Sequence, residues 1–195
     1  MDFAALVALA FVASITPGPN NLMLLGAGMN HGIRRTLPHL AGVSLGFAFL
    51  IFLVAVGLGT IFEQYEPVEY VLKLLGGSYL AYLAWKIFNT RSVADARQSS
   101  VPMTLVQAAM FQWVNPKAWV MATTASGTLL DTNSSVSVGA AKLTLGFWII
   151  NLPCISTWML SGVFASRWVD SDQQVRTINR ALGILLAGTV VWLMW

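Results

Sequence analysis

Six long apolar segments fill almost the whole chain and leave only short polar stretches between them. Their approximate ranges are 3–29, 40–62, 68–88, 103–130, 143–165 and 178–195. A helix needs about 20 apolar residues to cross a bilayer, so 195 residues hold these spans and little else. Only 10 % of the residues are charged, against roughly 25 % in an ordinary soluble domain. The sequence therefore predicts an all-α integral membrane protein with a single transmembrane domain over residues 1–195, and it excludes an ordinary soluble enzyme.

The first and fourth segments are too long for one straight span. About 27 residues at 1.5 Å each reach ~40 Å, whereas the hydrocarbon core is ~30 Å thick. Each segment carries a polar, proline-containing interruption near its middle: Thr16, Pro17, Gly18, Pro19, Asn20 and Asn21 in the first, and Asn115, Pro116 and Lys117 in the fourth. Proline removes a backbone donor and clashes with an upstream carbonyl. We therefore expect two broken helices, with Asn20 or Asn21 capping the start of the second half-helix.

The basic residues are distributed unequally between alternate connections. The first, third and fifth connections have eight basic residues at or near them, namely Arg34, Arg35, Lys86, Arg91, Arg97, Arg167, Arg176 and Arg180. The other side has Lys73 and Lys142, beside the acidic residues Asp2, Glu63, Glu66, Glu69 and Asp131. Because cytoplasmic loops carry the excess of lysine and arginine, we expect a multi-pass protein of the bacterial inner (plasma) membrane with both termini outside the cytoplasm.

The two halves of the chain, residues 1–90 and 101–195, resemble each other. Residues 41–47 match 141–147, and the pair Thr16-Pro17 matches Asn115-Pro116. Each half holds three predicted spans, so the second half is inserted upside down relative to the first. Such inverted-topology repeats are related by a pseudo-two-fold axis in the membrane plane, with the substrate site near the midplane. The axis would bring the two helix breaks together, which predicts a central binding site and alternating access.

The two breaks supply the candidate substrate-binding residues. The N-terminus of a half-helix presents free N–H groups and a partial positive charge, which suit a substrate carboxylate. We expect the site to include Thr16, Pro17, Gly18, Pro19, Asn20, Asn21, Asn115, Pro116, Lys117 and Asn151. Asn151, Gln107 and Gln112 are polar residues within apolar spans that either face the cavity or form hydrogen bonds between helices. The alternative for the breaks is a structural kink satisfied by neighbouring helices.

Lys117 is the one ionisable residue well inside an apolar segment. A lysine at that depth is costly and is by default a functional candidate. It either pairs with a substrate carboxylate or loses its proton during transport; alternatively it reaches an interface or caps carbonyls of the broken helix. No acidic residue lies mid-span, so proton coupling would use Lys117, the substrate amine, or His31 and His39. The two histidines are more simply explained as solvated loop residues.

Several other activities are excluded or disfavoured by missing motifs. The chain has no Walker A sequence, no His-Glu-x-x-His and no Gly-x-Ser-Gly. Its single cysteine, Cys154, permits no internal disulfide and no cysteine-based metal site. We therefore expect no catalytic residues, no cofactor and no metal, and the net charge of +3 is better explained by membrane topology than by nucleic-acid binding. Gly42-xxx-Gly46 predicts a close helix contact, within the chain or between copies in a homo-oligomer.

The ordered motifs resemble those of the LysE/RhtB family of amino-acid exporters. They are the run from Thr16 to Asn21, His31-Gly32-x-Arg34, the run 40–47, the run 76–86 and Asn115-Pro116-Lys117-Ala118. The double asparagine and the run 41–47 look most like the cysteine and O-acetylserine exporter branch. The chain departs from many members in having Asn20 where they have Asp, and Thr36 where they often have Gly, so substrate identity does not carry over.

The resemblance implies a secondary transporter that exports a small amino acid or an amino-acid derivative from the cytoplasm. The implied partners are that small molecule, protons moving in antiport, and the lipid bilayer. Two alternatives remain open on the sequence: a channel, whose flux would not saturate, and a membrane scaffold or assembly subunit without transport activity.

Overall fold

The computed structural model describes residues 2–59, 66–90, 102–131, 134–169 and 171–194, and these residues form helices and no strand. The elements are α1 (Phe3–Ile15), α2 (Pro19–Leu53), the π-helical turn η1 (Val54–Leu58), α4 (Glu66–Phe88), α6 (Leu105–Val114), α7 (Pro116–Leu129), α8 (Val136–Ala165), the 3-10 turn η2 (Ser166–Trp168) and α9 (Asp172–Met194). The all-helical class predicted from the apolar segments is thus confirmed for this part of the chain. Among the residues used to predict orientation, Glu63, Arg91 and Arg97 lie outside it.

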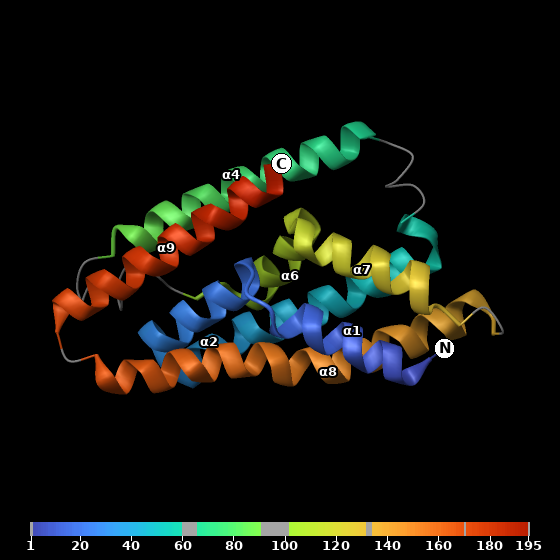
Figure 1. Cartoon of the computed structure of the whole chain (residues 1–195), viewed down its shortest axis with the longest axis horizontal. Helices are drawn as coiled ribbons and strands as arrows, with labels where there is room; N and C mark the ends of the chain where they lie inside the picture. Colours follow the sequence, from blue (N-terminus) through green and yellow to red (C-terminus); the bar gives the residue numbers. More distant parts are fainter. Residues whose placement is uncertain (1, 60–65, 91–101, 132–133, 170, 195) are drawn as a thin grey trace.

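The first two predicted segments are joined by a turn inside α2 and not by a loop. Gly32 has φ 70° and ψ −178°, a conformation that glycine adopts without the steric cost a Cβ would add. The Thr36 hydroxyl donates to the Gly32 carbonyl oxygen at 2.8 Å. Leu24 and Val43 pack in one core cluster, although a straight helix would hold them ~29 Å apart. The chain therefore reverses at Gly32, and Figure 1 shows α2 folded back on itself. Our expectation of a solvated loop around residues 30–39 is wrong.

Both predicted helix breaks are present. The first separates α1 from α2, with Thr16 (φ −64°, ψ 144°) and Gly18 (φ −172°, ψ 175°) in extended conformations. The second is a single extended residue, Asn115 (φ −92°, ψ 105°), between α6 and α7. In each break a proline, Pro19 or Pro116, occupies the first turn of the following helix, where its missing N–H would have had no intrahelical partner.

The helices pack mainly in pairs that join the two halves of the chain. α2 packs most extensively against α8, and α4 packs against α9; Figure 1 shows α4 and α9 side by side along the top of the bundle. Phe47 and Phe147, matched positions of the predicted repeat, make an edge-to-face contact with ring centroids 5.6 Å apart. Contact between equivalent positions is what a pseudo-two-fold axis would produce, while the inverted repeat itself stays a prediction.

Close helix approaches depend on small residues, as the spacing of Gly42 and Gly46 predicts. A Cβ on Gly42 would collide with the carbonyl oxygen of Leu105, and one on Gly46 would lie 2.5 Å from the Cα of Ala109. Both neighbours belong to α6, so this motif packs within the chain. Of the two open readings of Gly42-xxx-Gly46, the structure supports the internal contact.

Two described stretches are long and apolar enough to cross a membrane: Pro19–Leu58, with 40 residues, and Val136–Trp168, with 33 residues. α1 and α6 are apolar but shorter, because the breaks divide the segments to which they belong. The structure thus agrees with a membrane protein, and the count of six spans remains a prediction. In Figure 1 the reversal within α2, the end of α4, the end of α8 and the start of α9 lie at one end of the bundle. The end of α7 and the N-terminus lie at the other end.

Candidate functional site

The carbonyl groups at the end of α1 are satisfied by side chains from elsewhere in the chain. The Asn21 amide nitrogen donates to the Ser14 carbonyl at 2.9 Å and to the Thr16 carbonyl at 2.8 Å. The indole N–H of Trp158 donates to the Ile15 carbonyl at 3.1 Å. Asn21 therefore caps the end of α1, and the expectation that Asn20 or Asn21 caps the start of α2 is wrong. Gly18 occupies that capping position, without a side-chain hydrogen bond.

Lys117 joins the second break to the first. Its Nζ donates to the Thr16 carbonyl at 2.8 Å, to the Thr16 hydroxyl at 2.9 Å and to the Pro17 carbonyl at 3.3 Å. An ammonium group has three donors, so these acceptors engage all of them. The sequence left several roles open for Lys117. The structure shows one of them: Lys117 caps carbonyl groups at the broken helix.

A reciprocal amide pair forms a second connection between the breaks. The Asn20 amide nitrogen donates to Gln112 Oε1 at 2.8 Å, and the Gln112 amide nitrogen donates to Asn20 Oδ1 at 3.3 Å. Gln112 is completely buried and also donates to the Ala108 carbonyl at 2.8 Å. Gln112 therefore forms hydrogen bonds between α6 and α2. Gln107 forms a capping box with Thr104 at the start of α6, so its interpretation as a cavity residue is wrong.

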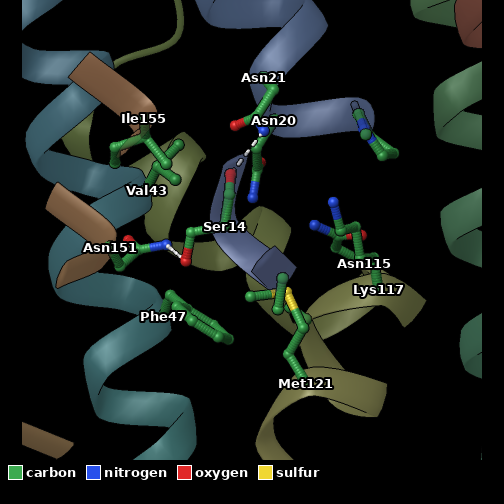
Figure 2. A pocket seen from close by; sticks show the side chains of 14 residues that line it. Ser14, Asn20, Asn21, Val43, Phe47, Asn115, Lys117, Met121, Asn151 and Ile155 are labelled. Carbon is green, nitrogen blue, oxygen red and sulfur yellow. Dashed lines mark hydrogen bonds between the residues drawn. The ribbon is translucent and has the colours of Figure 1, made fainter. Parts of the chain in front are cut away.

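A cavity of about 360 Å³, partly open to the outside, lies where the two breaks meet. Figure 2 shows Asn115 and Lys117 on one side and Asn151 and Phe47 on the other. The lining residues come from α1, α2, the second break, α7 and α8: Ala13, Ser14, Gly18, Pro19, Asn20, Asn21, Val43, Phe47, Asn115, Lys117, Ala118, Met121, Asn151 and Ile155.

The cavity contains two buried amide oxygens that lack a partner. Asn151 donates from its amide nitrogen to the Ser14 hydroxyl at 2.9 Å, which orients its side chain. The Oδ1 atoms of Asn115 and Asn151 are buried and have no hydrogen-bond partner within the described ranges. Leaving a buried acceptor unpaired costs about 1–3 kcal/mol, so a bound donor would remove this cost.

A smaller cavity of about 320 Å³ lies on the opposite face of the breaks. Pro17 and Pro116 line it, together with Leu80 of α4 and Thr189 of α9. Gly18, Pro19, Asn115 and Lys117 line both cavities and so separate them. A Cβ on Gly18 would lie 2.8 Å from Lys117 Cδ and 3.0 Å from its Nζ, so the absence of a side chain at this position makes room for the lysine.

All ten residues expected at the site therefore cluster at the breaks. Seven line the larger cavity, Pro17 and Pro116 line the smaller one, and Thr16 holds the Lys117 amine. The sequence analysis missed the residues Ser14, Val43, Phe47, Met121 and Ile155. Helical spacing offered a partial signal, because Val43 and Phe47, or Asn151 and Ile155, are four residues apart and share a helix face. Among the described residues no group of three acidic, histidine or cysteine side chains is placed to hold a metal.

The family described as LysE type translocator matches residues 11–195. The cysteine/O-acetylserine efflux proteins of Escherichia coli (strain K12), Shigella flexneri serotype 5b (strain 8401) and Shigella sonnei (strain Ss046) are each 30 % identical to this chain over 179 residues. Those alignments cover 90 % of this chain and 88 % of each relative. No solved structure matches. The match over nearly the whole length establishes that the chain belongs to the LysE type translocator family.

Proposed function

We propose that this protein exports a small, zwitterionic amino acid or amino-acid derivative from the cytoplasm by proton-coupled secondary transport. The observation that carries the proposal is the meeting of two helix breaks around one cavity, with Lys117 joining them. The relatives named as cysteine/O-acetylserine efflux proteins support a substrate of this size and charge. They make cysteine and O-acetylserine the first compounds to test.

The cavity offers complementary groups to both ends of a zwitterion. The N–H groups of Asn20 and Asn21 in α2 and of Lys117 in α7 have no intrahelical acceptor and lie at the positive end of the helix dipole. They suit the substrate carboxylate. The unpartnered Oδ1 atoms of Asn115 and Asn151 suit the substrate ammonium group. Phe47 and Met121 supply the apolar wall for a small side chain.

Lys117 links substrate binding to the shape of the first break. With no substrate, its three donors are engaged by Thr16 and Pro17. A substrate carboxylate would draw at least one of these donors away, because charge-assisted hydrogen bonds are roughly twice as strong as neutral ones. The released carbonyl then leaves the break free to change its angle. Occupancy and conformation become coupled through one side chain, as alternating access requires.

Proton antiport in this proposal uses the amine of Lys117 or the amine of the substrate. Among the described residues that line the larger cavity, none is acidic and Lys117 is the single titratable side chain. A carboxylate relay is therefore not available there. Loss of a proton from Lys117 would weaken its hydrogen bonds to Thr16 and Pro17. These are the same hydrogen bonds that a substrate carboxylate would weaken.

The deciding experiment is transport in proteoliposomes that contain the purified protein. We expect saturable movement of radiolabelled cysteine or O-acetylserine that accumulates against a gradient when a pH difference is imposed. A protonophore should abolish the uphill component, and protein-free liposomes serve as control. Flux that never saturates and cannot be driven uphill would indicate a channel. The absence of flux across a full panel of amino acids would contradict the proposal and favour a scaffold.

A further inference from the structure

A third cavity lies between the first half of α2 and the end of α4. It has a volume of about 560 Å³, partly open to the outside. Its lining comes from both sides of the Gly32 turn, from α4 and from the residues before α6: Met23, Gly26, Ala27, Asn30, His39, Leu83, Lys86, Ile87, Pro102 and Met103. This end of the bundle is the one predicted to face the cytoplasm.

His39 is the feature of this cavity that packing does not explain. Its side chain is only 2 % exposed, and neither ring nitrogen has a hydrogen-bond partner among the residues described. A neutral imidazole has one N–H donor and one acceptor nitrogen. Buried polar groups in native proteins are nearly always paired, and an exception calls for a missing partner. The prediction that His39 is a solvated loop residue is wrong, and its position on the cavity wall points to a ligand.

The other polar lining residues define the charge of that ligand. Lys86 is half-buried and has no ion-pair partner in the described part of the chain. Asn30 adds an amide that can both donate and accept. No described acidic residue lines the cavity, and its remaining walls are apolar. A positive charge and an imidazole N–H in an apolar cavity favour a carboxylate attached to a small apolar group.

The third cavity and the larger cavity at the breaks, here called the central cavity, are connected by one half of α2. Asn20 lines the central cavity and Asn30 lines the third cavity, on the same helical stretch of α2. Ten residues of helix span ~15 Å, which is about half the thickness of the hydrocarbon core. Met23 of this cavity lies one turn beyond Asn20. A molecule that leaves this cavity towards the centre would therefore follow the surface of one half-helix.

We propose that this cavity is an entry site that receives the carboxylate of the exported molecule from the cytoplasm, with Lys86 and His39 as the carboxylate-binding groups. The inference rests on the proposed export function and adds a second, peripheral binding step to it. Asn30 accepts from the substrate ammonium group, and the apolar walls contact the side chain. The site is distinct from the breaks, since none of Lys86, His39 and Asn30 lines either cavity at the breaks.

The test measures transport of radiolabelled O-acetylserine and cysteine in oriented proteoliposomes, with substrate supplied to either face. Lys86→Met and His39→Phe should each raise the half-saturating concentration at the cytoplasmic face at least tenfold. The value at the outer face should change less than threefold, because the central site is intact. Lys142→Met is the matched control, since Lys142 pairs with Asp131 at 3.0 Å, far from the cavity in the sequence and the fold.

Protection of a cysteine from labelling measures substrate binding at this cavity even when a variant transports poorly. In a Cys154→Ser background, Ala27→Cys places a thiol on the cavity wall without removing a proposed binding group. It should be protected from a maleimide by millimolar O-acetylserine but not by the methyl ester of the same compound, which lacks the carboxylate. Wild-type half-saturation in both variants, or equal labelling with and without substrate, would overturn the entry site. An effect of the variants that appears only with anionic lipid would overturn it in favour of a lipid-headgroup site. If the unmodified protein moves no amino acid at all, the export function itself fails.

Discussion

The amine of Lys117 donates to the carbonyl oxygen of Thr16 at 2.8 Å across 101 positions of sequence. The acceptor is one of the last carbonyls of α1, which the first helix break frees from its own helix. The donor belongs to the first turn of α7, which the second break begins. One side chain therefore connects the second break to the irregular backbone of the first. The lysine is thus a structural cap, and under the proposed function it is also the group that responds to substrate.

Replacing Lys117 with methionine removes three hydrogen bonds and the positive charge while keeping the length of the side chain. We expect at least a 30-fold loss of O-acetylserine or cysteine efflux with normal insertion into the membrane. The midpoint of thermal unfolding in detergent should also fall, because Thr16 and Pro17 lose their donor. Lys142→Met, at a surface ion pair, should retain efflux. Efflux at the wild-type rate in Lys117→Met would contradict a central role for this residue.

Gly18→Ala tests the contact between the two breaks without removing any polar group. The added methyl would lie 2.8 Å from Lys117 Cδ, closer than the van der Waals distance, so the lysine side chain must move. We expect a reduction in efflux of fivefold or more. Gly127→Ala is the matched control, because no atom lies within 4 Å of a Cβ placed there. Equal efflux from both variants would show that the position of Lys117 is not critical.

The Asn20–Gln112 pair should behave as a coupled unit. Each single replacement by leucine leaves a buried amide without its partner, whereas the double replacement removes both. A double-mutant cycle on the free energy of unfolding is therefore expected to give a coupling of about 0.5–3 kcal/mol. Chemical denaturation in mixed micelles supplies the measurement. Additive effects would mean that the two amides stabilise the fold independently.

Asn151→Leu is expected to affect substrate affinity more than stability. Its Oδ1 atom has no partner among the described residues, so its removal costs the empty protein little, although the hydrogen bond to Ser14 is lost. The half-saturating concentration for transport should rise about tenfold. Asn89→Leu, which alters an exposed asparagine at the end of α4, is the control. An unchanged half-saturating concentration in Asn151→Leu would place the substrate amine elsewhere.

Membrane orientation can be checked by labelling single cysteines. In a Cys154→Ser background, Arg34→Cys lies beside the Gly32 turn and Ser137→Cys lies near the start of α8, both at exposed positions. We expect a membrane-impermeant maleimide to label position 137 in intact cells and position 34 only after the cells are opened. The reverse pattern would invert the predicted topology and place both termini in the cytoplasm.

The helical class, the two breaks and the ten residues that cluster at them could be predicted from the sequence. This is possible because chain length, proline chemistry and the scarcity of charge are local properties, and each restricts the backbone wherever the chain folds. The resemblance to the exporter family also rested on ordered motifs that can be compared without a structure. The match over residues 11–195 confirmed it.

The hydrogen-bond partners of these residues depend on the tertiary packing. Asn21 caps the helix before it and not the one after it, since the Ser14 and Thr16 carbonyls lie within reach once the chain turns at Gly18. His39 is buried because the reversal at Gly32 packs its helix against α6 and α8, and no periodicity in the sequence reveals that turn. The contact of Lys117 with Thr16 joins atoms 101 positions apart. Such contacts depend on how whole helices pack, which local sequence does not specify.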